Sequence, residues 1–123
     1  MSNAKHTITD SEYSIMKILW GSENKMTVSD VVKALDGNDW TPSTVSTFLQ
    51  RLLKKNVVSC EKKGNTNLYY PILKQNDYDM SETESFLSKI YKGSVKNLVA
   101  ALYENKKLSK EDMSELKSMF DLE

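Results

Sequence analysis

One stretch of the sequence carries most of the residues whose side chains could do chemistry, and that chemistry is recognition. Residues 41–75 hold six basic side chains and a single acid, Glu61, which is a local charge of +5. Small hydroxyl and amide groups precede the cations, and such groups can hydrogen bond to base edges, whereas Lys and Arg suit phosphates. The predicted base and nearby phosphate contacts are Ser43, Thr44, Ser46, Thr47 and Gln50, and the predicted backbone contacts are Arg51, Lys54, Lys55, Lys62, Lys63 and Asn65.

Residues that could support catalysis are scarce. The chain has one His, His6, and one Cys, Cys60, from which no nucleophile, base and orienting group can be assembled. A single cysteine also excludes an intramolecular disulfide framework and a multi-cysteine zinc site. We therefore expect no enzyme activity, no metal and no cofactor, and we interpret Cys60 as a small apolar residue on a buried strand face.

The total charge hides an uneven distribution. The 123 residues include 17 Lys and Arg against 17 Asp and Glu, so the formal charge is zero. Residues 1–75 carry ten bases and seven acids, and residues 76–123 carry seven and ten. The zero total excludes a strongly basic nucleic-acid-coating protein and an acidic disordered chain. The excess of positive charge in residues 41–75 indicates a small face that contacts phosphates. The alternative interpretation is a charged surface that only faces water.

Helix-capping residues predict the elements that position this stretch. Thr9 with Glu12 forms a capping box that opens a first helix. Thr27 with Asp30 opens a second helix of about ten residues, which Gly37 ends.

The third helix and a hairpin follow directly. Thr41 caps this helix and Pro42 occupies its first position, where a missing N–H costs nothing. Its apolar stripe comprises Val45, Phe48, Leu49, Leu52 and Leu53. Asn56 suits the left-handed position after the helix, and strands over residues 57–60 and 68–72 flank a Gly64-Asn65 turn.

Helix, short helix, helix and hairpin is the order of a winged helix-turn-helix, in which the third helix enters the major groove. The predicted fold is mainly α with a small β-hairpin. We expect a winged-helix DNA-binding domain over residues 8–75 and a three-helix dimerisation region over residues 76–123. Residues 1–7 are interpreted as a tag or disordered tail.

Three further helices are predicted in the second region. Ser81 with Glu84 opens one that Gly93 ends, an apolar i, i+3, i+4 pattern marks the next, and Ser109 with Asp112 opens the last. Three short helices are too few to enclose their own apolar side chains, so a two-fold dimer is predicted, with packing against the winged helix as the alternative. The residues assigned to dimerisation are Val95, Leu98, Val99, Leu102, Tyr103, Leu116 and Phe120.

The sequence resembles the penicillinase-repressor family, which includes the BlaI and MecI repressors, over nearly the whole chain from Ile8. The segments that carry the resemblance are residues 9–20 (TDSEYSIMKILW), 40–45 (WTPSTV), 49–55 (LQRLLKK), 68–71 (LYYP) and 86–93 (FLSKIYKG). The resemblance implies a homodimeric transcriptional repressor that binds a palindromic operator in double-stranded DNA and controls β-lactam resistance genes.

The resemblance also implies a release mechanism and shows two departures. In the β-lactam branch a membrane sensor-transducer triggers proteolysis at an Asn-Phe pair in the dimerisation region, and the matching position here is Ala101-Leu102. The family often has Lys where this chain has Ser43. The copper-responsive branch needs two Cys-x-Cys motifs, which a single cysteine excludes.

Two other functions fit parts of the pattern. A winged-helix regulator could release DNA on binding a small molecule directly, in a pocket lined by Tyr69, Tyr78, Phe86 and Tyr91. A winged helix that binds only proteins should have an apolar or acidic outer face, and this one is polar and basic. The absence of a hydrophobic signal segment or a membrane-length apolar run leads us to expect a cytoplasmic protein.

Overall fold

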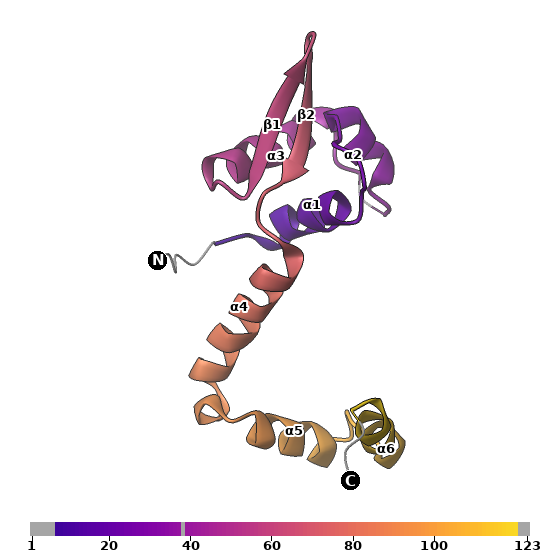
Figure 1. Cartoon of the computed structure of the whole chain (residues 1–123), viewed down its shortest axis with the longest axis vertical. Coiled ribbons are helices and arrows are strands. Elements are labelled where there is room, and N and C mark those ends of the chain that lie inside the picture. The colour runs from indigo at the N-terminus through magenta and orange to yellow at the C-terminus, as the bar shows by residue number, and fades with distance from the viewer. Residues whose placement is uncertain (1–6, 38, 121–123) are drawn as a thin grey trace. The chain divides into compact units, whose positions relative to one another are not determined.

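A computed structural model describes residues 7–37 and 39–120 of the chain (Figure 1). The chain forms two compact units, one up to Ser81 and the other from Glu82. The predicted tail, His6 included, lies outside the described residues except for Thr7. Among the helices that the structure describes, none has the length and apolarity to cross a bilayer.

The first three helices of the chain begin at the predicted caps. They are α1 (Asp10–Trp20), α2 (Val28–Ala34) and α3 (Pro42–Lys54). The Thr9 and Thr27 side chains each accept a hydrogen bond from the backbone N–H three residues later, and both capping boxes are complete. Thr41 caps α3 in the same way, ahead of Pro42.

Helix α2 is shorter than predicted. It spans seven residues, because Leu35 leaves the helical conformation (φ −72°, ψ 123°). Leu35 packs against the core from this extended conformation, and Gly37 follows with φ +77°. The helix therefore ends at a residue held by the core, and the glycine serves the turn that follows.

The wing is an antiparallel hairpin of β1 (Val58–Lys63) and β2 (Thr66–Pro71). The turn at Gly64-Asn65 is as predicted, but the strands extend further towards it, so that the charged residues up to Lys63 belong to β1. Met26 adds a bridge on the other side of β2, exchanging two hydrogen bonds with Tyr69 of 2.7 and 2.9 Å.

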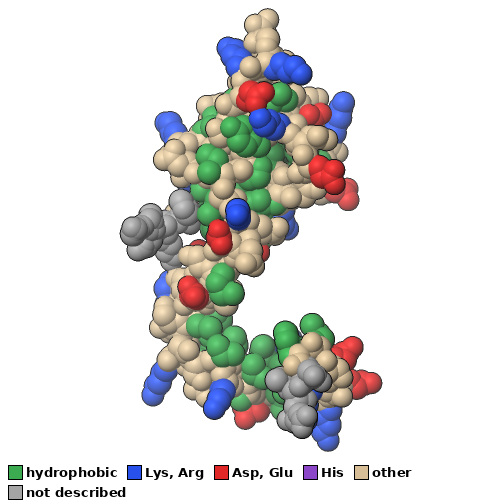
Figure 2. All heavy atoms as spheres, in the orientation of Figure 1, with side chains coloured by type: hydrophobic (Ala, Val, Ile, Leu, Met, Phe, Trp, Pro, Cys, Tyr) green, Lys and Arg blue, Asp and Glu red, His purple; other side chains and the backbone are tan. Residues whose placement is uncertain are grey.

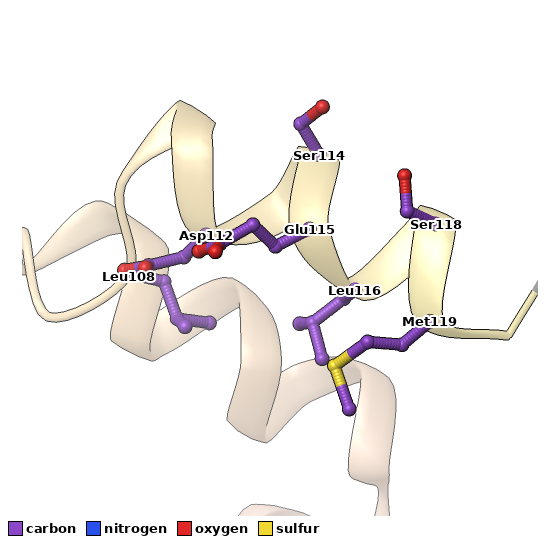
Figure 3. A pocket seen from close by; sticks show the side chains of 7 residues that line it. All are labelled: Leu108, Asp112, Ser114, Glu115, Leu116, Ser118 and Met119. Carbon is purple, nitrogen blue, oxygen red and sulfur yellow. The ribbon is translucent and has the colours of Figure 1, made fainter.

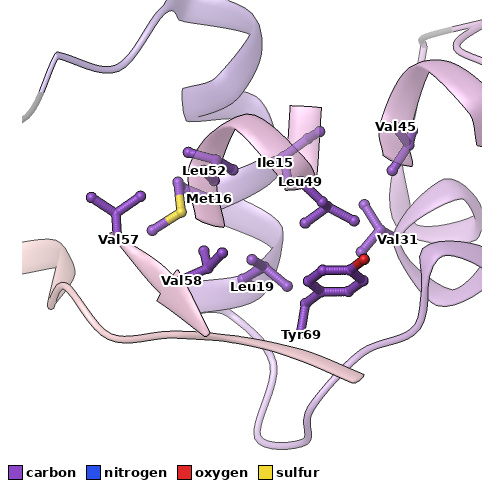
Figure 4. Close-up of a cluster of buried hydrophobic side chains, with 10 residues drawn as sticks. All are labelled: Ile15, Met16, Leu19, Val31, Val45, Leu49, Leu52, Val57, Val58 and Tyr69. Carbon is purple, nitrogen blue, oxygen red and sulfur yellow. The ribbon is translucent and has the colours of Figure 1, made fainter. Parts of the chain in front are cut away.

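One hydrophobic core holds these elements together (Figure 4). Its fully buried members come from the first three helices, from the hairpin and from the residue just before the hairpin: Ile15, Met16, Leu19, Val31, Val45, Leu49, Leu52, Val57, Val58 and Tyr69. Three of the five residues in the predicted stripe of α3 are buried, and Phe48 and Leu53 pack at the edge of the core. The opposite face of α3 is therefore left towards solvent.

Helix α4 (Gln75–Lys89) begins six residues before the predicted start at Ser81, which lies inside it. The cause is an aromatic cluster at its first turn. Tyr78 is buried and its ring centroid lies 5.7 Å from that of Tyr13 and 6.2 Å from that of Trp20. Trp20 donates a 2.8 Å hydrogen bond to the Leu73 carbonyl just ahead of the helix. Packing against α1 thus sets the start of α4.

The second unit contains the end of α4, a short turn η1 (Tyr91–Gly93), α5 (Val95–Glu104) and α6 (Lys110–Met119). The Ser109–Asp112 capping box at the start of α6 is as predicted. Tyr91, Lys92 and Gly93 all have left-handed backbone conformations, with φ of 55°, 50° and 74°. Tyr91 is therefore outside the helix in which the sequence pattern placed it.

In the described stretch from Glu82 to Phe120, no side chain is buried. Many apolar side chains are instead exposed over α4, α5 and α6, where Figure 2 shows them as green patches. The most exposed are Val95, Met119 and Phe120, at 58%, 71% and 63%. Each helix has an apolar face that this single chain does not cover.

Candidate nucleic-acid interface

The outer face of α3 presents the predicted polar residues. Ser43, Thr47 and Gln50 are exposed, and Thr44 and Ser46 are half-buried on the same helix. Arg51 and Lys54 are exposed further along, near the C-terminal end. The first half of the helix thus offers small hydrogen-bonding groups, and the second half offers cations where they also suit the helix dipole.

The hydroxyl groups on this face are partly oriented by the helix itself. The Thr47 hydroxyl donates a 3.1 Å hydrogen bond to the Ser43 carbonyl. The Thr41 hydroxyl donates to the Thr44 hydroxyl at 3.2 Å and accepts from the Thr44 N–H at 3.2 Å. With its proton directed at the backbone, Thr47 offers outward an acceptor oxygen and a methyl group.

Gln50 has a partner on the hairpin. Its side-chain nitrogen, Nε2, donates a 3.1 Å hydrogen bond to the Tyr69 hydroxyl of β2. The two residues are 19 positions apart, so the spacing pattern of α3 gave no sign of this contact.

An aromatic pair supports Arg51. The guanidinium carbon lies 5.6 Å from the centroid of the Phe48 ring, which lies 5.0 Å from that of Trp40. A cation held over an aromatic face has fewer conformations to lose when it binds a phosphate. Sequence reasoning placed Phe48 only in the core stripe and did not assign Trp40 to the site.

The tip of the wing carries exposed cations. Lys62, Lys63 and Asn65 are all exposed, and Figure 2 shows Lys and Arg side chains on both sides of the hairpin tip. Glu61, the acid of this strand, pairs with Lys25. Hydrogen bonding and attraction to Lys25 lower the pKa of Glu61, so it stays ionised and compensated.

Lys25 joins this part of the surface from outside the predicted segment. Its ammonium nitrogen lies 4.5 Å from the centroid of the Tyr70 ring. Lys25 precedes the Met26 bridge to β2, which brings it next to the hairpin. Only the folded topology could have revealed its place there.

Lys55 has different surroundings from the other predicted phosphate contacts. Its ammonium pairs with the carboxylate of Glu12 on α1, and the two side chains are 30% and 1% exposed. Burial raises the pKa of Glu12, but hydrogen bonds from Lys55 and from the Thr9 N–H outweigh it and lower the pKa overall. Lys55 therefore joins the end of α3 to α1, in addition to any contact with a phosphate.

The predicted dimerisation residues lie in the second unit. Val95, Leu102, Tyr103, Leu116 and Phe120 are exposed, and Leu98 and Val99 are half-buried. Ala101 and Leu102, the predicted cleavage position, are both within α5.

A hollow of about 660 Å³ runs along α6 (Figure 3). Leu108, Leu116 and Met119 give it apolar walls, with Asp112 and Glu115 among the other lining residues.

The four aromatic residues assigned to a small-molecule pocket have separate roles in the two units. Tyr69 and Tyr78 are buried in the packing of the first unit, and Phe86 and Tyr91 are exposed in the second. Cys60 lies on the side of β1 that packs against the core, as predicted, and its side chain is half-buried there.

Comparison with known proteins finds relatives over nearly the whole chain. The sequence model of the penicillinase repressor family matches residues 8–121. A penicillinase repressor of Bacillus licheniformis is 34% identical over 110 residues, covering 89% of this chain and 85% of the relative. The methicillin resistance regulatory protein MecI of Mammaliicoccus sciuri is 26% identical over 98% of both chains. The solution structure of monomeric B. licheniformis BlaI with the blaP half-operator covers 61% of this chain and 92% of its own, with TM-score 0.51 and 32% identity.

Proposed function

The chain belongs to the penicillinase repressor family, and from this premise we propose that it represses transcription by binding operator DNA through α3 and the wing. Its family is one of DNA-binding repressors, so the chain is not an enzyme. The observation that carries the proposal is the outer face of α3, where exposed polar residues are followed by Arg51 and Lys54 with no acid among them.

The proposed assignment of contacts follows from exposure and chemistry. Ser43, Thr44, Ser46, Thr47 and Gln50 contact bases and nearby phosphates in the major groove. Arg51, Lys54, Lys62, Lys63 and Asn65 contact the backbone and set the register of the protein on the duplex. Lys55 contributes charge to this set, although its partner in the free protein is Glu12.

The operator is proposed to be a palindrome bound by a homodimer. The exposed apolar faces of α5 and α6 support this, because such faces on a small protein usually mark an interface. A two-fold dimer presents two reading helices related by the same symmetry as a palindromic site. The relative's structure on a half-operator, formed by a monomer, fits one winged helix per half-site.

Release from DNA is proposed to follow proteolysis at Ala101-Leu102, under the control of a membrane sensor-transducer. Both residues lie in α5, next to half-buried Leu98 and Val99 of the proposed dimer contact. A cut there would divide the helix and so weaken the dimer. Loss of operator binding on adding a small-molecule inducer to the intact purified chain would contradict this mechanism.

The decisive experiment is selection of bound sequences from random double-stranded DNA, followed by fluorescence polarisation across salt concentrations. We expect a dyad-symmetric sequence whose half-sites are about 10 bp apart, or a multiple of that, and binding that weakens steeply with salt. Two results would overturn the proposed dimer. One is a set of selected sequences without dyad symmetry, and the other is a full-length chain that sediments as a monomer at micromolar concentration when mixed with the operator.

A further inference from the structure

The hydrogen bond between Gln50 and Tyr69 joins the reading face of α3 to the core of the same unit. Gln50 is exposed, whereas Tyr69 is 1% exposed. We infer that Tyr69 is a positioning residue: its hydroxyl fixes the Gln50 amide in the orientation that reads one adenine of the operator. This inference rests on the proposed function and makes one base preference of that function depend on a buried tyrosine.

Tyr69 is held firmly enough to act as a fixed point. Its backbone is paired on one side with Cys60 of β1 and on the other with Met26, through hydrogen bonds of 2.7 and 2.9 Å. Its ring lies in the core among Leu19, Leu49 and Val31, as Figure 4 shows. A ring enclosed in this way cannot swing, so the position of its hydroxyl is set by the fold.

The fixed hydroxyl determines how the amide of Gln50 is turned. A glutamine amide has two N–H donors and one acceptor oxygen. Because one N–H is directed at the Tyr69 hydroxyl, the other N–H and the oxygen Oε1 are left for a partner outside the protein. Without the tyrosine hydroxyl the amide could rotate, and binding DNA would then require it to lose that rotational freedom.

The remaining donor and acceptor match one base. In the major groove adenine presents an acceptor, N7, beside a donor, the N6 amino group, and a glutamine amide can bond to both. Guanine presents two acceptors at the same edge, so it cannot satisfy Oε1. The arrangement thus predicts a preference for adenine at one position of each half-site.

The test is a double-mutant cycle read as base preference on the full-length protein. Tyr69→Phe removes the hydroxyl and keeps the ring, Gln50→Ala removes the reading group, and the third variant carries both substitutions. For each, affinities are measured by fluorescence polarisation for the selected operator, for operators with each base pair replaced in turn, and for random DNA. Tyr70→Phe is the matched control, because it removes a phenol hydroxyl from the neighbouring residue and keeps the ring under Lys25.

We expect Gln50→Ala to abolish the adenine preference at one position, and Tyr69→Phe to reduce it at the same position by about five- to tenfold. In the Gln50→Ala background, Tyr69→Phe should have no further effect on base preference. Binding to random DNA should match the wild type in Tyr69→Phe and in Tyr70→Phe, which shows that both variants keep the fold.

Two results would overturn the inference. One is an unchanged base preference in Tyr69→Phe, and the other is a further loss when Tyr69→Phe is added to Gln50→Ala. A wild-type protein that binds every sequence equally would instead overturn the proposed function, so the two failures are distinguishable.

Discussion

Lys54 and Lys55 are adjacent in the sequence and differ in what they contact. Lys54 is exposed on the outer side of α3, whereas Lys55 pairs with the buried carboxylate of Glu12. A buried acceptor that loses its partner keeps the full cost of its desolvation. The two lysines are therefore a natural pair of variants for separating DNA binding from stability.

We expect Lys55→Ala to lower the free energy of unfolding by about 1–3 kcal/mol, since it leaves Glu12 without its cation. Lys54→Ala should change it by less than about 0.5 kcal/mol, as is usual for an exposed site. Urea denaturation of both variants measures this difference. Equal stabilities would show that the Lys55–Glu12 pair does not stabilise the fold.

Glu12 should make stability depend on pH. Its folded-state pKa is below the ordinary value of 4.5, because its hydrogen bonds to Lys55 and Thr9 outweigh the effect of burial. The unfolded chain binds the proton first as the pH falls, so the stabilisation is full above about pH 4.5 and is lost as pH falls through the folded-state pKa. Glu12→Gln should flatten the stability curve in this acidic range, which urea midpoints between pH 7 and pH 3 would reveal. Parallel curves for the two proteins would contradict the assignment.

Thr47 and Lys63 should affect binding in different ways. Thr47→Ala removes an outward acceptor on the reading helix, so it should change the sequence preference by about 1–3 kcal/mol at one base position. Lys63→Ala removes a cation at the wing tip, so it should weaken binding to all sequences and reduce the salt slope by about 1. Titrations with operator and random DNA at several salt concentrations measure both. If both variants bind like the wild type, the placement of the reading helix and wing is wrong.

At the scale of elements, predictability follows the range of the contact that sets each boundary. The capping boxes at Thr9 and Ser109 act within three residues, and both helices begin where the sequence predicts. Ser81 with Glu84 has the same pattern, yet α4 starts at Gln75 because Tyr78 packs on Tyr13 and Trp20. A capping motif predicts where a helix begins unless the packing of a buried side chain shifts that start.

The candidate site also contains features that the sequence predicts and features that depend on long-range contacts. Its polar and basic members follow from helical spacing along α3. The pair Gln50–Tyr69 and the pair Lys55–Glu12 connect residues 19 and 43 positions apart, so they depend on how α3 packs against β2 and α1. Sequence spacing could predict which residues face outward, but not which of them the core holds in place.

The aromatic cluster gives a prediction about α4. Tyr78→Ala should lower the free energy of unfolding of the first unit by about 3 kcal/mol, because it removes a buried ring that packs on Tyr13 and Trp20. Met80→Ala is the matched control, since that side chain of α4 is 53% exposed. Thermal unfolding followed by circular dichroism measures both. Similar losses for the two variants would show that the cluster does not anchor the helix.

At the scale of the whole molecule, the formal charge of zero is the sum of two unlike regions. The basic excess of residues 41–75 lies on the reading helix and wing, and the acidic excess of residues 76–123 lies in a region that we propose pairs with a second copy. A modest total charge limits binding to DNA of any sequence, since that binding depends mainly on phosphate contacts. More of the discrimination is then left to the small polar groups of α3.

Truncating the chain would separate DNA binding from the proposed dimerisation. A chain that ends after Ser81 keeps the whole first unit, including Tyr78, and lacks the proposed dimer contacts. We expect it to fold, to sediment as a monomer, and to bind the full operator more weakly than the intact chain does. A chain that ends after Gln75 lacks Tyr78 and should be less stable. A truncated protein that still sediments as a dimer would show that dimerisation does not depend on the second unit.

The chain has two tryptophans, Trp20 and Trp40, and both lie in the first unit. Trp20 lies in the aromatic cluster at the start of α4, and Trp40 lies beside Phe48 at the start of the reading helix. Tryptophan fluorescence therefore does not report directly on the region from Glu82 onward. It reports on changes in that region only when they alter the first unit. Replacing Trp20 with Phe leaves a single emitter at the reading helix, so operator binding can be followed optically without an attached dye.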